Sequence, residues 1–255
     1  GHHGQSQLDQ PVMALGTGRV VESRNGDYVE GDRVFGGMGA QRYARRPGKG
    51  YRKLDDSMVP ARTWLGLLGM TTGLTAYAGM VLVGDVKAGD TVAVSAAGGA
   101  VGSIACQVAK LKGARVIGIA GGPDKCSYLI DVIGCDAAID YKNDDVAQQL
   151  QILAADGLNV FFDNVGGAIL DAALDNLASE ARVVICGAIS QYADLATVTG
   201  PSLYLRIAES NASMRGFTVD HFKAQFPMME TDLAQWASEG KVSMPEHIES
   251  GLERF

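Results

Sequence analysis

The stretch of sequence from Thr91 to Gly102 reads TVAVSAAGGAVG, an apolar run that ends in a glycine-rich turn. Ile104, Val108 and Leu111 follow at helical spacing, and residues 115–120 (RVIGIA) have the pattern of a buried strand. Strand, turn, helix and strand together fit the roughly thirty residues of one βαβ unit. Such a turn directs the free N–H groups of a new helix at a nucleotide pyrophosphate. The stretch therefore predicts a dinucleotide-binding unit.

The turn itself, residues 97–102, reads AGGAVG and has alanine in the first place of the G-x-G-x-x-G pattern. Gly99 would let the backbone approach the phosphates, and Gly102 would let the helix pack on the strand, with Ala100 and Val101 between them. An ordinary strand-to-helix turn is the alternative, because the chain contains 33 glycines. The surrounding βαβ pattern favours the phosphate-binding interpretation.

The end of the second strand indicates which dinucleotide binds. An acidic side chain there would favour NAD, but the sequence after Ile119 is AGGPDK, residues 120–125. The glycines leave room for a 2′-phosphate, and Lys125 lies where an ammonium can reach it. The sequence therefore predicts NADP(H). In the alternative interpretation Lys125 is a solvated helix residue, and we expect Asp124 to be an N-cap.

The alternation of strands and helices continues along the chain. Strands are expected at 137–140, 159–163, 181–186 and 214–219, and helices at 146–153 and 169–177. This order predicts an α/β fold with a doubly wound parallel sheet covered on both faces. Ligands bind such sheets at the carboxyl ends of the strands, so Asn164, residues 187–192 and those after Phe217 should line one cleft. Asn164 is either a turn former or a ligand.

Residues 16–70 have a different sequence pattern. The segments GTGRVVES, GDRVFGG and AQRYA are expected to be short strands between glycine turns, as in a partial antiparallel barrel. Asp27 to Arg33 is interpreted as a turn between two of them.

Six segments carry a family resemblance: GLTAYAG (73–79), SAAGGAVGS (95–103), AKLKGARVIGIAGGPDKC (109–126), AAIDYK (137–142), FFDNVGG (161–167) and CGAISQY (186–192). They resemble the zinc-independent medium-chain dehydrogenase/reductases of the prostaglandin reductase and curcumin reductase type. The resemblance covers the chain from about Gly16 to the C-terminus. The resemblance implies an enzyme that reduces the carbon–carbon double bond of α,β-unsaturated ketones or aldehydes with NADPH. It also implies a homodimer.

The resemblance extends to cofactor-binding residues. It implies that residues 99–102 hold the pyrophosphate, that Lys125 holds the 2′-phosphate and that Tyr141 lies beside the adenosine ribose. Tyr141 as a rim aromatic and Cys186 as a small buried filler are the alternatives. The contacts implied on the nicotinamide side are Asn164, Cys186, Gly187, Ala188, Ile189, Ser190, Phe217, Thr218 and Val219.

The resemblance also implies the domain organisation. Residues 71–239 would form the Rossmann domain, and residues 1–70 with 240–255 would form part of a GroES-like barrel, the catalytic domain. A full-length member of the family would have further barrel segments before Gln10 and after Phe255, so the chain is expected to be a fragment or to have segments that are not represented.

The chemistry requires a hydrogen-bond donor where the enolate oxygen of the acceptor develops. Tyr192 is the candidate, since a tyrosine hydroxyl can orient or protonate and the family places a tyrosine at the substrate carbonyl. A loop tyrosine packed at a domain edge is the alternative. Tyr204 and Tyr77 are second choices, and Tyr77 is expected to pack within the GLTAY helix.

No metal is expected. The four cysteines, Cys106, Cys126, Cys135 and Cys186, form no C-x-x-C pair, and a structural zinc site needs closely spaced cysteines. His2 and His3 resemble the remnant of a purification tag, and the other two histidines stand alone.

Composition excludes several classes of function. The formal net charge of -7 provides no basic footprint for a nucleic acid. The longest apolar candidate, residues 65–83, is interrupted by glycines and threonines, so no membrane span is expected. Cysteines that look unpaired suit the cytoplasm.

Three functions remain open: an enone reductase, a quinone reductase that uses the same hydride donor, and a non-catalytic NADPH-binding protein of the same fold. The sequence leaves the physiological substrate open as well.

Overall fold

The computed structural model describes residues 11–191 and 198–254. The chain divides into two compact units, one formed by residues 1–69 with 245–255 and the other by residues 70–244.

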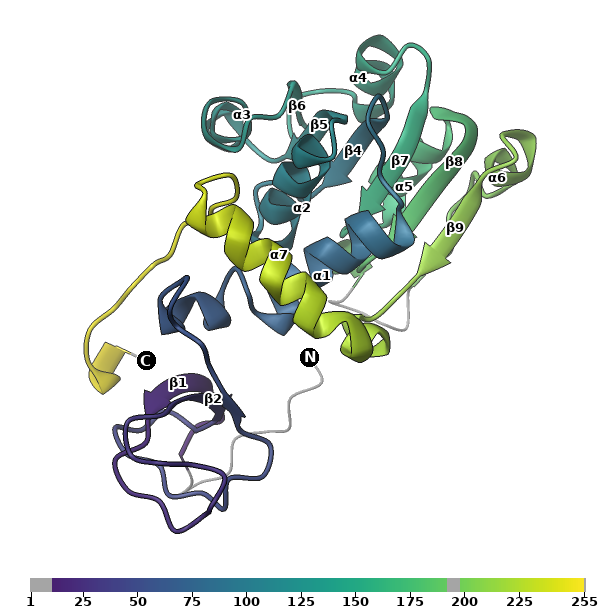
Figure 1. The fold of residues 1–255 in the computed structure, drawn as a ribbon. Coiled ribbons are helices and arrows are strands. Elements are labelled where there is room, and N and C mark those ends of the chain that lie inside the picture. Colours follow the sequence, from purple (N-terminus) through teal and green to yellow (C-terminus); the bar gives the residue numbers. More distant parts are fainter. Residues whose placement is uncertain (1–10, 192–197, 255) are drawn as a thin grey trace. The chain divides into compact units, whose positions relative to one another are not determined.

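The larger unit is built on a six-stranded parallel sheet with the strand order β6-β5-β4-β7-β8-β9 (Figure 1). The order runs outward in opposite directions from β4 and β7, as in the doubly wound dinucleotide-binding fold. The α/β fold class predicted from the sequence is confirmed. The strands are β4 (Thr91–Ser95), β5 (Arg115–Ala120), β6 (Ala137–Asp140), β7 (Leu158–Asp163), β8 (Leu177–Ile185) and β9 (Ser213–Gly216).

Helices cover both faces of the sheet (Figure 1). They are α1 (Thr75–Tyr77), α2 (Ala100–Leu111), α3 (Pro123–Tyr128), α4 (Val146–Leu153), α5 (Gly167–Leu174), α6 (Leu205–Glu209) and α7 (Phe226–Ser238). Wider or tighter helical turns lie at Ala61–Leu65, Met70–Leu74, Ala78–Val83, Leu129–Ile133, Ile189–Gln191, Val219–Gln225 and Leu252–Arg254.

The core lies between the sheet and these helices. Ile117 and Ile119 of β5 and Phe161 of β7 point to the face covered by α4 and α5 and are fully buried. Burial of one such side chain stabilises the fold by about 1.5–3 kcal/mol relative to an exposed one. Because the sheet is covered on both sides, β5 is apolar at nearly every position rather than at alternate ones.

Several expected boundaries were wrong. The helix expected at 169–177 ends at Leu174, because the Asn176 side chain donates to the Ala172 carbonyl at 2.7 Å and the chain turns there. β8 then begins at Leu177 and passes through an irregularity near Glu180, whose φ is 60°. The strand expected at 214–219 ends at Gly216.

The smaller unit contains a three-stranded antiparallel sheet with the order β1-β2-β3, formed by Leu15–Arg19, Arg33–Gly37 and Arg52–Lys53. The first two strands follow the expected segments. The expected strand AQRYA (40–44) does not form, and Tyr43 is largely exposed. This segment has no partner strand within the described residues that could complete its backbone hydrogen bonds.

Candidate cofactor and substrate site

The glycine-rich turn joins the carboxyl end of β4 to α2. Gly99 is the extended N-cap residue of this 12-residue helix, and Gly99 and Ala100 are exposed. The first N–H groups of a helix have no intrahelical acceptor and carry partial positive charge. The first turn of α2 contains no acidic side chain that would occupy them. This open turn fits a pyrophosphate.

Gly102 is required by the geometry of the turn. Ala96 has a left-handed backbone, with φ of 48°, and its carbonyl oxygen points into the first turn of α2. A Cβ at Gly102 would come within 2.3 Å of that oxygen. The predicted role of Gly102 in close packing of helix and strand agrees with this contact.

Three residues predicted for the adenosine side lie together at the ends of β5 and β6: Gly121, Lys125 and Tyr141. The Tyr141 ring covers Gly121, where a Cβ would come within 2.8 Å of the ring. Lys125, in the first turn of α3, extends along Gly98, with a separation of 3.5 Å between its Cδ and a Cβ built on that glycine. Lys125 and Tyr141 are both exposed. An exposed cation and a tyrosine beside two glycines fit a 2′-phosphate.

Asp140 organises this corner and was not predicted from the sequence. Its carboxylate accepts the Gly122 N–H at 2.7 Å and the Lys142 N–H at 3.1 Å. The Gly122 N–H is the main cause that holds the pKa of Asp140 below its usual value. The expectation that Asp124 is the N-cap of α3 was wrong, because Gly122 has that position and Asp124 lies in the first turn.

At the nicotinamide side, the loops after β7 and β8 meet the carboxyl end of β4. The Asn164 side chain donates to the Ser95 carbonyl at 2.8 Å, and the Ile189 N–H donates to the Asn164 carbonyl at 3.0 Å. The N–H groups of Cys186 and Gly187 donate to the Asp163 carbonyl at 2.9 and 3.1 Å. The structure therefore brings Asn164 together with the run 186–190.

Cys186 and Ser190 have distinct environments in this run. Burial and the nearby Asp163 carboxylate raise the pKa of the Cys186 thiol to about 12. The Ser190 hydroxyl donates to the Val165 carbonyl at 2.6 Å. Ala188 lies between them, half-buried.

Residues 217–219 follow β9. The Phe217 N–H donates to the Ile185 carbonyl at 3.3 Å, and its ring packs edge-on to Phe222. Val219 is buried, and Thr218 Oγ1 lies 3.4 Å from His221 Nδ1. Packing accounts for the side chains of Phe217 and Val219, which leaves Thr218 as the exposed polar group of the three.

The candidate tyrosines differ in placement. Tyr192 lies outside the described residues. Tyr204 is the N-cap of α6 and is 59% exposed. Tyr77 is buried, stacks on Trp236 and donates to Asp232 Oδ2 at 2.6 Å, and this burial with the hydrogen bond raises its pKa. Tyr77 therefore packs in the core, as expected.

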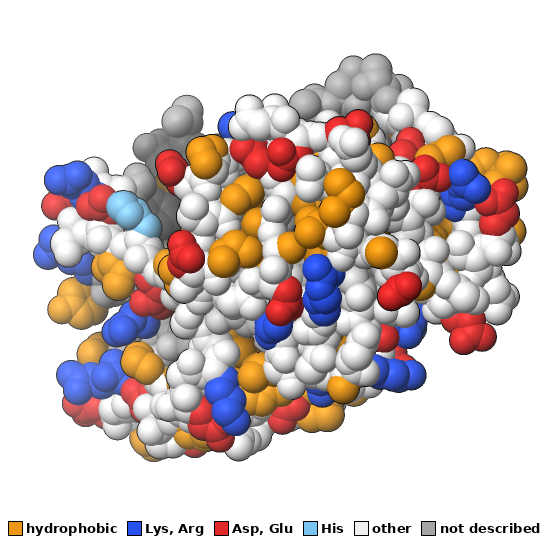
Figure 2. All heavy atoms as spheres, turned by 90° about the horizontal axis from the view of Figure 1, so that it is seen from above, with side chains coloured by type: hydrophobic (Ala, Val, Ile, Leu, Met, Phe, Trp, Pro, Cys, Tyr) orange, Lys and Arg blue, Asp and Glu red, His pale blue; other side chains and the backbone are white. Residues whose placement is uncertain are grey.

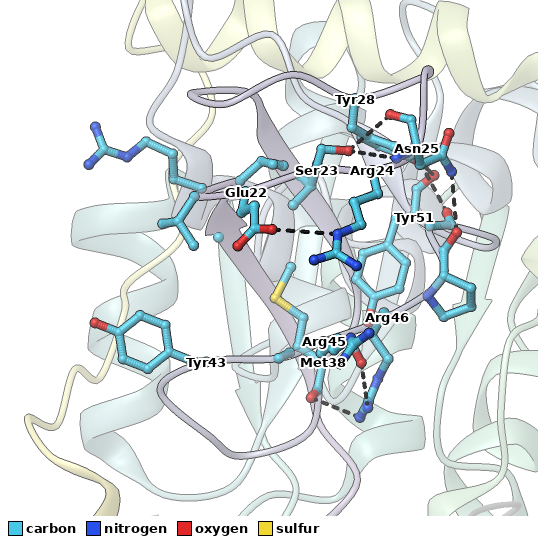
Figure 3. A pocket seen from close by; sticks show the side chains of 18 of the residues that line it. Glu22, Ser23, Arg24, Asn25, Tyr28, Met38, Tyr43, Arg45, Arg46 and Tyr51 are labelled. Carbon is cyan, nitrogen blue, oxygen red and sulfur yellow. Dashed lines mark hydrogen bonds and ion pairs between the residues drawn. The ribbon is translucent and has the colours of Figure 1, made fainter.

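The smaller unit contains a hollow of about 1100 Å³ that coincides with none of the predicted site residues (Figure 3). Within it, the Tyr28 hydroxyl lies 2.9 Å from the Tyr51 carbonyl oxygen, to which it donates, and Arg24 pairs with Glu22 at 3.7 Å. These contacts hold loops of the small sheet together.

Acidic and basic side chains are interspersed over the face of the molecule shown in Figure 2. None of the described helices is long and apolar enough to cross a membrane. Within residues 11–191 and 198–254, no three metal-ligating side chains form a group.

Comparisons with known proteins cover nearly the whole chain. A family model described as zinc-binding dehydrogenase matches residues 100–236. The NADPH-dependent curcumin reductase of Escherichia coli (strain K12) is 38% identical over 248 residues, which are 95% of this chain and 72% of that protein. Prostaglandin reductase 1 of Mus musculus is 38% identical over 250 residues, 96% of this chain and 75% of that protein. CurA of Vibrio vulnificus in complex with NADPH has a TM-score of 0.86 at 35% identity, with coverage of 100% and 77%.

Proposed function

Because this chain belongs to the zinc-binding dehydrogenase family, and within it to the zinc-independent NADP-dependent reductases, we propose that it reduces the double bond of α,β-unsaturated ketones or aldehydes. NADP(H) is its cofactor and, when bound, supplies the hydride for the β-carbon of the acceptor. The α-carbon takes up a proton. The observation that carries the proposal is the open turn before α2 together with Lys125 and Tyr141 at the ends of β5 and β6.

The chain's own residues would bind the two halves of the cofactor separately. The free N–H groups of Ala100, Val101 and Gly102 bind the pyrophosphate. The Lys125 ammonium and the Tyr141 hydroxyl bind the 2′-phosphate. Asn164, residues 186–190 and residues 217–219 flank the nicotinamide.

Tyr192 is the proposed catalytic residue. Negative charge develops on the carbonyl oxygen of the acceptor as the hydride arrives, and a phenolic O–H directed at that oxygen stabilises it. The same hydroxyl can orient the substrate or pass it a proton. Tyr204 is the second candidate.

Oxidation of NADPH, followed with an enone, with a quinone and without an acceptor, tests the function. We expect turnover with the enone and little without an acceptor. Turnover with the quinone alone would replace the enone reductase by a quinone reductase. Tight NADPH binding without turnover of either acceptor would leave the non-catalytic alternative. Tyr192→Phe should lower turnover with little change in NADPH affinity, and unchanged turnover would remove Tyr192 from the mechanism.

We propose further that residues 1–70 and 240–255 belong to the catalytic domain, and that the chain works as a homodimer in the cytoplasm. β9 supports pairing, since it is the last strand of the sheet and pairs only with β8 among the described strands. The four cysteines are free, which suits a reducing compartment. Light scattering after size exclusion tests the dimer, and cell fractionation tests the location.

A further inference from the structure

Ser95 and Asp163 are the last residues of β4 and β7, the two strands between which the sheet reverses its order. Ligands of this fold class bind at that switch point, outside the carboxyl ends of the strands. Both side chains are almost fully buried, with exposed fractions of 0% and 1%.

The Ser95 hydroxyl connects the two strand ends. It donates to Asp163 Oδ1 at 2.9 Å and accepts the backbone N–H of Asn164 at 2.8 Å. The Asn164 side chain returns a bond of 2.8 Å to the Ser95 carbonyl. Three hydrogen bonds thus join Ser95, at the end of β4, to Asp163 and Asn164, at the end of β7.

The Asp163 carboxylate fixes the loop after β7. It accepts the Val165 N–H at 2.9 Å and the Gly166 N–H at 3.0 Å, in addition to the Ser95 hydroxyl. The carbonyl of the same residue accepts two N–H groups from the loop after β8. Asp163 therefore contacts the end of β4 and the loops after β7 and β8, and those two loops carry Asn164 and residues 186–190 of the proposed nicotinamide side.

An ionised carboxylate in this position is costly. Burial raises the pKa of Asp163, although the N–H groups of Gly166 and Val165 and the Ser95 hydroxyl favour the charged form. None of the ion pairs found among the described residues includes Asp163, so backbone and hydroxyl donors alone compensate its charge. Because burying a charge costs free energy, such a carboxylate is weak evidence for stability alone. Its hydrogen bonds instead point to a role in holding Ser95, Val165 and Gly166 in place.

We propose that Asp163 and Ser95 are positioning residues that hold the loops after β7 and β8 against the end of β4, in the arrangement that binds the nicotinamide half of NADP(H). The inference rests on the proposed function and deepens it. Neither side chain is a catalytic residue, since both act through the loops that they join.

The chain offers a matched control at the other end of the same two strands. Asn159 of β7 accepts the backbone N–H of Thr91 of β4 at 2.8 Å. This bond also joins β4 to β7 through a side chain, but at the amino ends, away from the cofactor turn. Loss of this hydrogen bond should lower the stability of the fold without changing the affinity for NADPH.

The experiment measures the dissociation constants of NADPH and of 2′,5′-ADP, which lacks the nicotinamide, for Asp163→Asn, Ser95→Ala, Asn159→Ala and the unmodified chain. We expect Asp163→Asn and Ser95→Ala to weaken NADPH binding about tenfold, as for loss of a charge-assisted hydrogen bond. Binding of 2′,5′-ADP should stay within about twofold, since one hydrogen bond lost elsewhere leaves its phosphate contacts intact. Asn159→Ala should leave both constants unchanged.

Two outcomes would overturn the inference. One is NADPH binding by both Ser95→Ala and Asp163→Asn at the affinity of the unmodified chain. The other is loss of 2′,5′-ADP binding in the same proportion as NADPH, which would indicate general damage to the sheet. Should Asp163→Asn fail to fold, Ser95→Ala decides alone, because it removes one hydroxyl and leaves the carboxylate. Failure of the unmodified chain to bind NADPH would instead overturn the proposed function, and the positioning role with it.

Discussion

Asp140 Oδ1 accepts the backbone N–H of Gly122 at 2.7 Å, so the end of β6 fixes the loop that follows β5. That loop holds the glycines on which the proposed adenosine site depends. Asp140→Ala should therefore raise the KM for NADPH and the KM for NADH by similar factors, about tenfold for a lost charge-assisted hydrogen bond. Steady-state kinetics with both cofactors would check this. An increase for NADPH alone would mean that Asp140 acts on the 2′-phosphate rather than on the loop.

Lys125 should show the opposite selectivity. Its ammonium meets a group that NADPH has and NADH lacks, so Lys125→Ala should raise the KM for NADPH roughly tenfold to a hundredfold and leave that for NADH nearly unchanged. Lys112→Ala, at the C-terminal end of α2 and away from the glycine-rich turn, is the control for the loss of one positive charge. Equal effects of Lys125→Ala on both cofactors would favour the alternative that Lys125 is a solvated helix residue.

The glycines of the turn should differ sharply in their tolerance of alanine. A Cβ at Gly102 would come within 2.3 Å of a backbone oxygen, whereas one at Gly98 meets only the flexible Lys125 side chain at 3.5 Å. We expect Gly102→Ala to destabilise the protein by about 3 kcal/mol, and Gly98→Ala to stay within about 1 kcal/mol. Urea unfolding measures both. Equal stability of the two variants would contradict the described path of the turn.

The sequence predicted the parts of the site that are local in the chain. The strand, turn and helix from Thr91 to Leu111 follow one another directly, so their periodicity and glycines were sufficient. Lys125 was predicted because the second strand of the unit ends without an acidic residue, whereas Tyr141 was predicted only from the family resemblance of IDYK.

The contacts between distant segments were not predicted. Ser95 and Asp163 are 68 residues apart, and only the pairing of β4 with β7 brings them together. The available signal was an acidic residue that closes the apolar run LNVFFD. The end of α5 was missed for a similar reason: Leu174 and Leu177 continue a helical spacing, while the Asn176 side chain turns the chain between them.

Asp136 should make the stability of the larger unit dependent on pH. Burial raises its pKa, but the hydrogen bonds from the Lys110 ammonium and the Val116 N–H outweigh burial and hold the pKa below 3.8. A carboxyl group whose pKa is lower in the folded than in the unfolded chain stabilises the fold above the unfolded value. That stabilisation is lost as the pH falls through the folded value.

Asp136→Asn should therefore lower the urea midpoint by the same amount at pH 7 and pH 5, and the difference from the unmodified chain should shrink below pH 3.8. Lys110→Met, which removes the cation and keeps most of the aliphatic stem, should reproduce part of the loss at pH 7. Asp131→Asn, an exposed change on the neighbouring helical turn, is the control. A midpoint difference that persists unchanged below pH 3.8 would show that packing of the side chain, rather than its charge, connects α2 to the strands beside it.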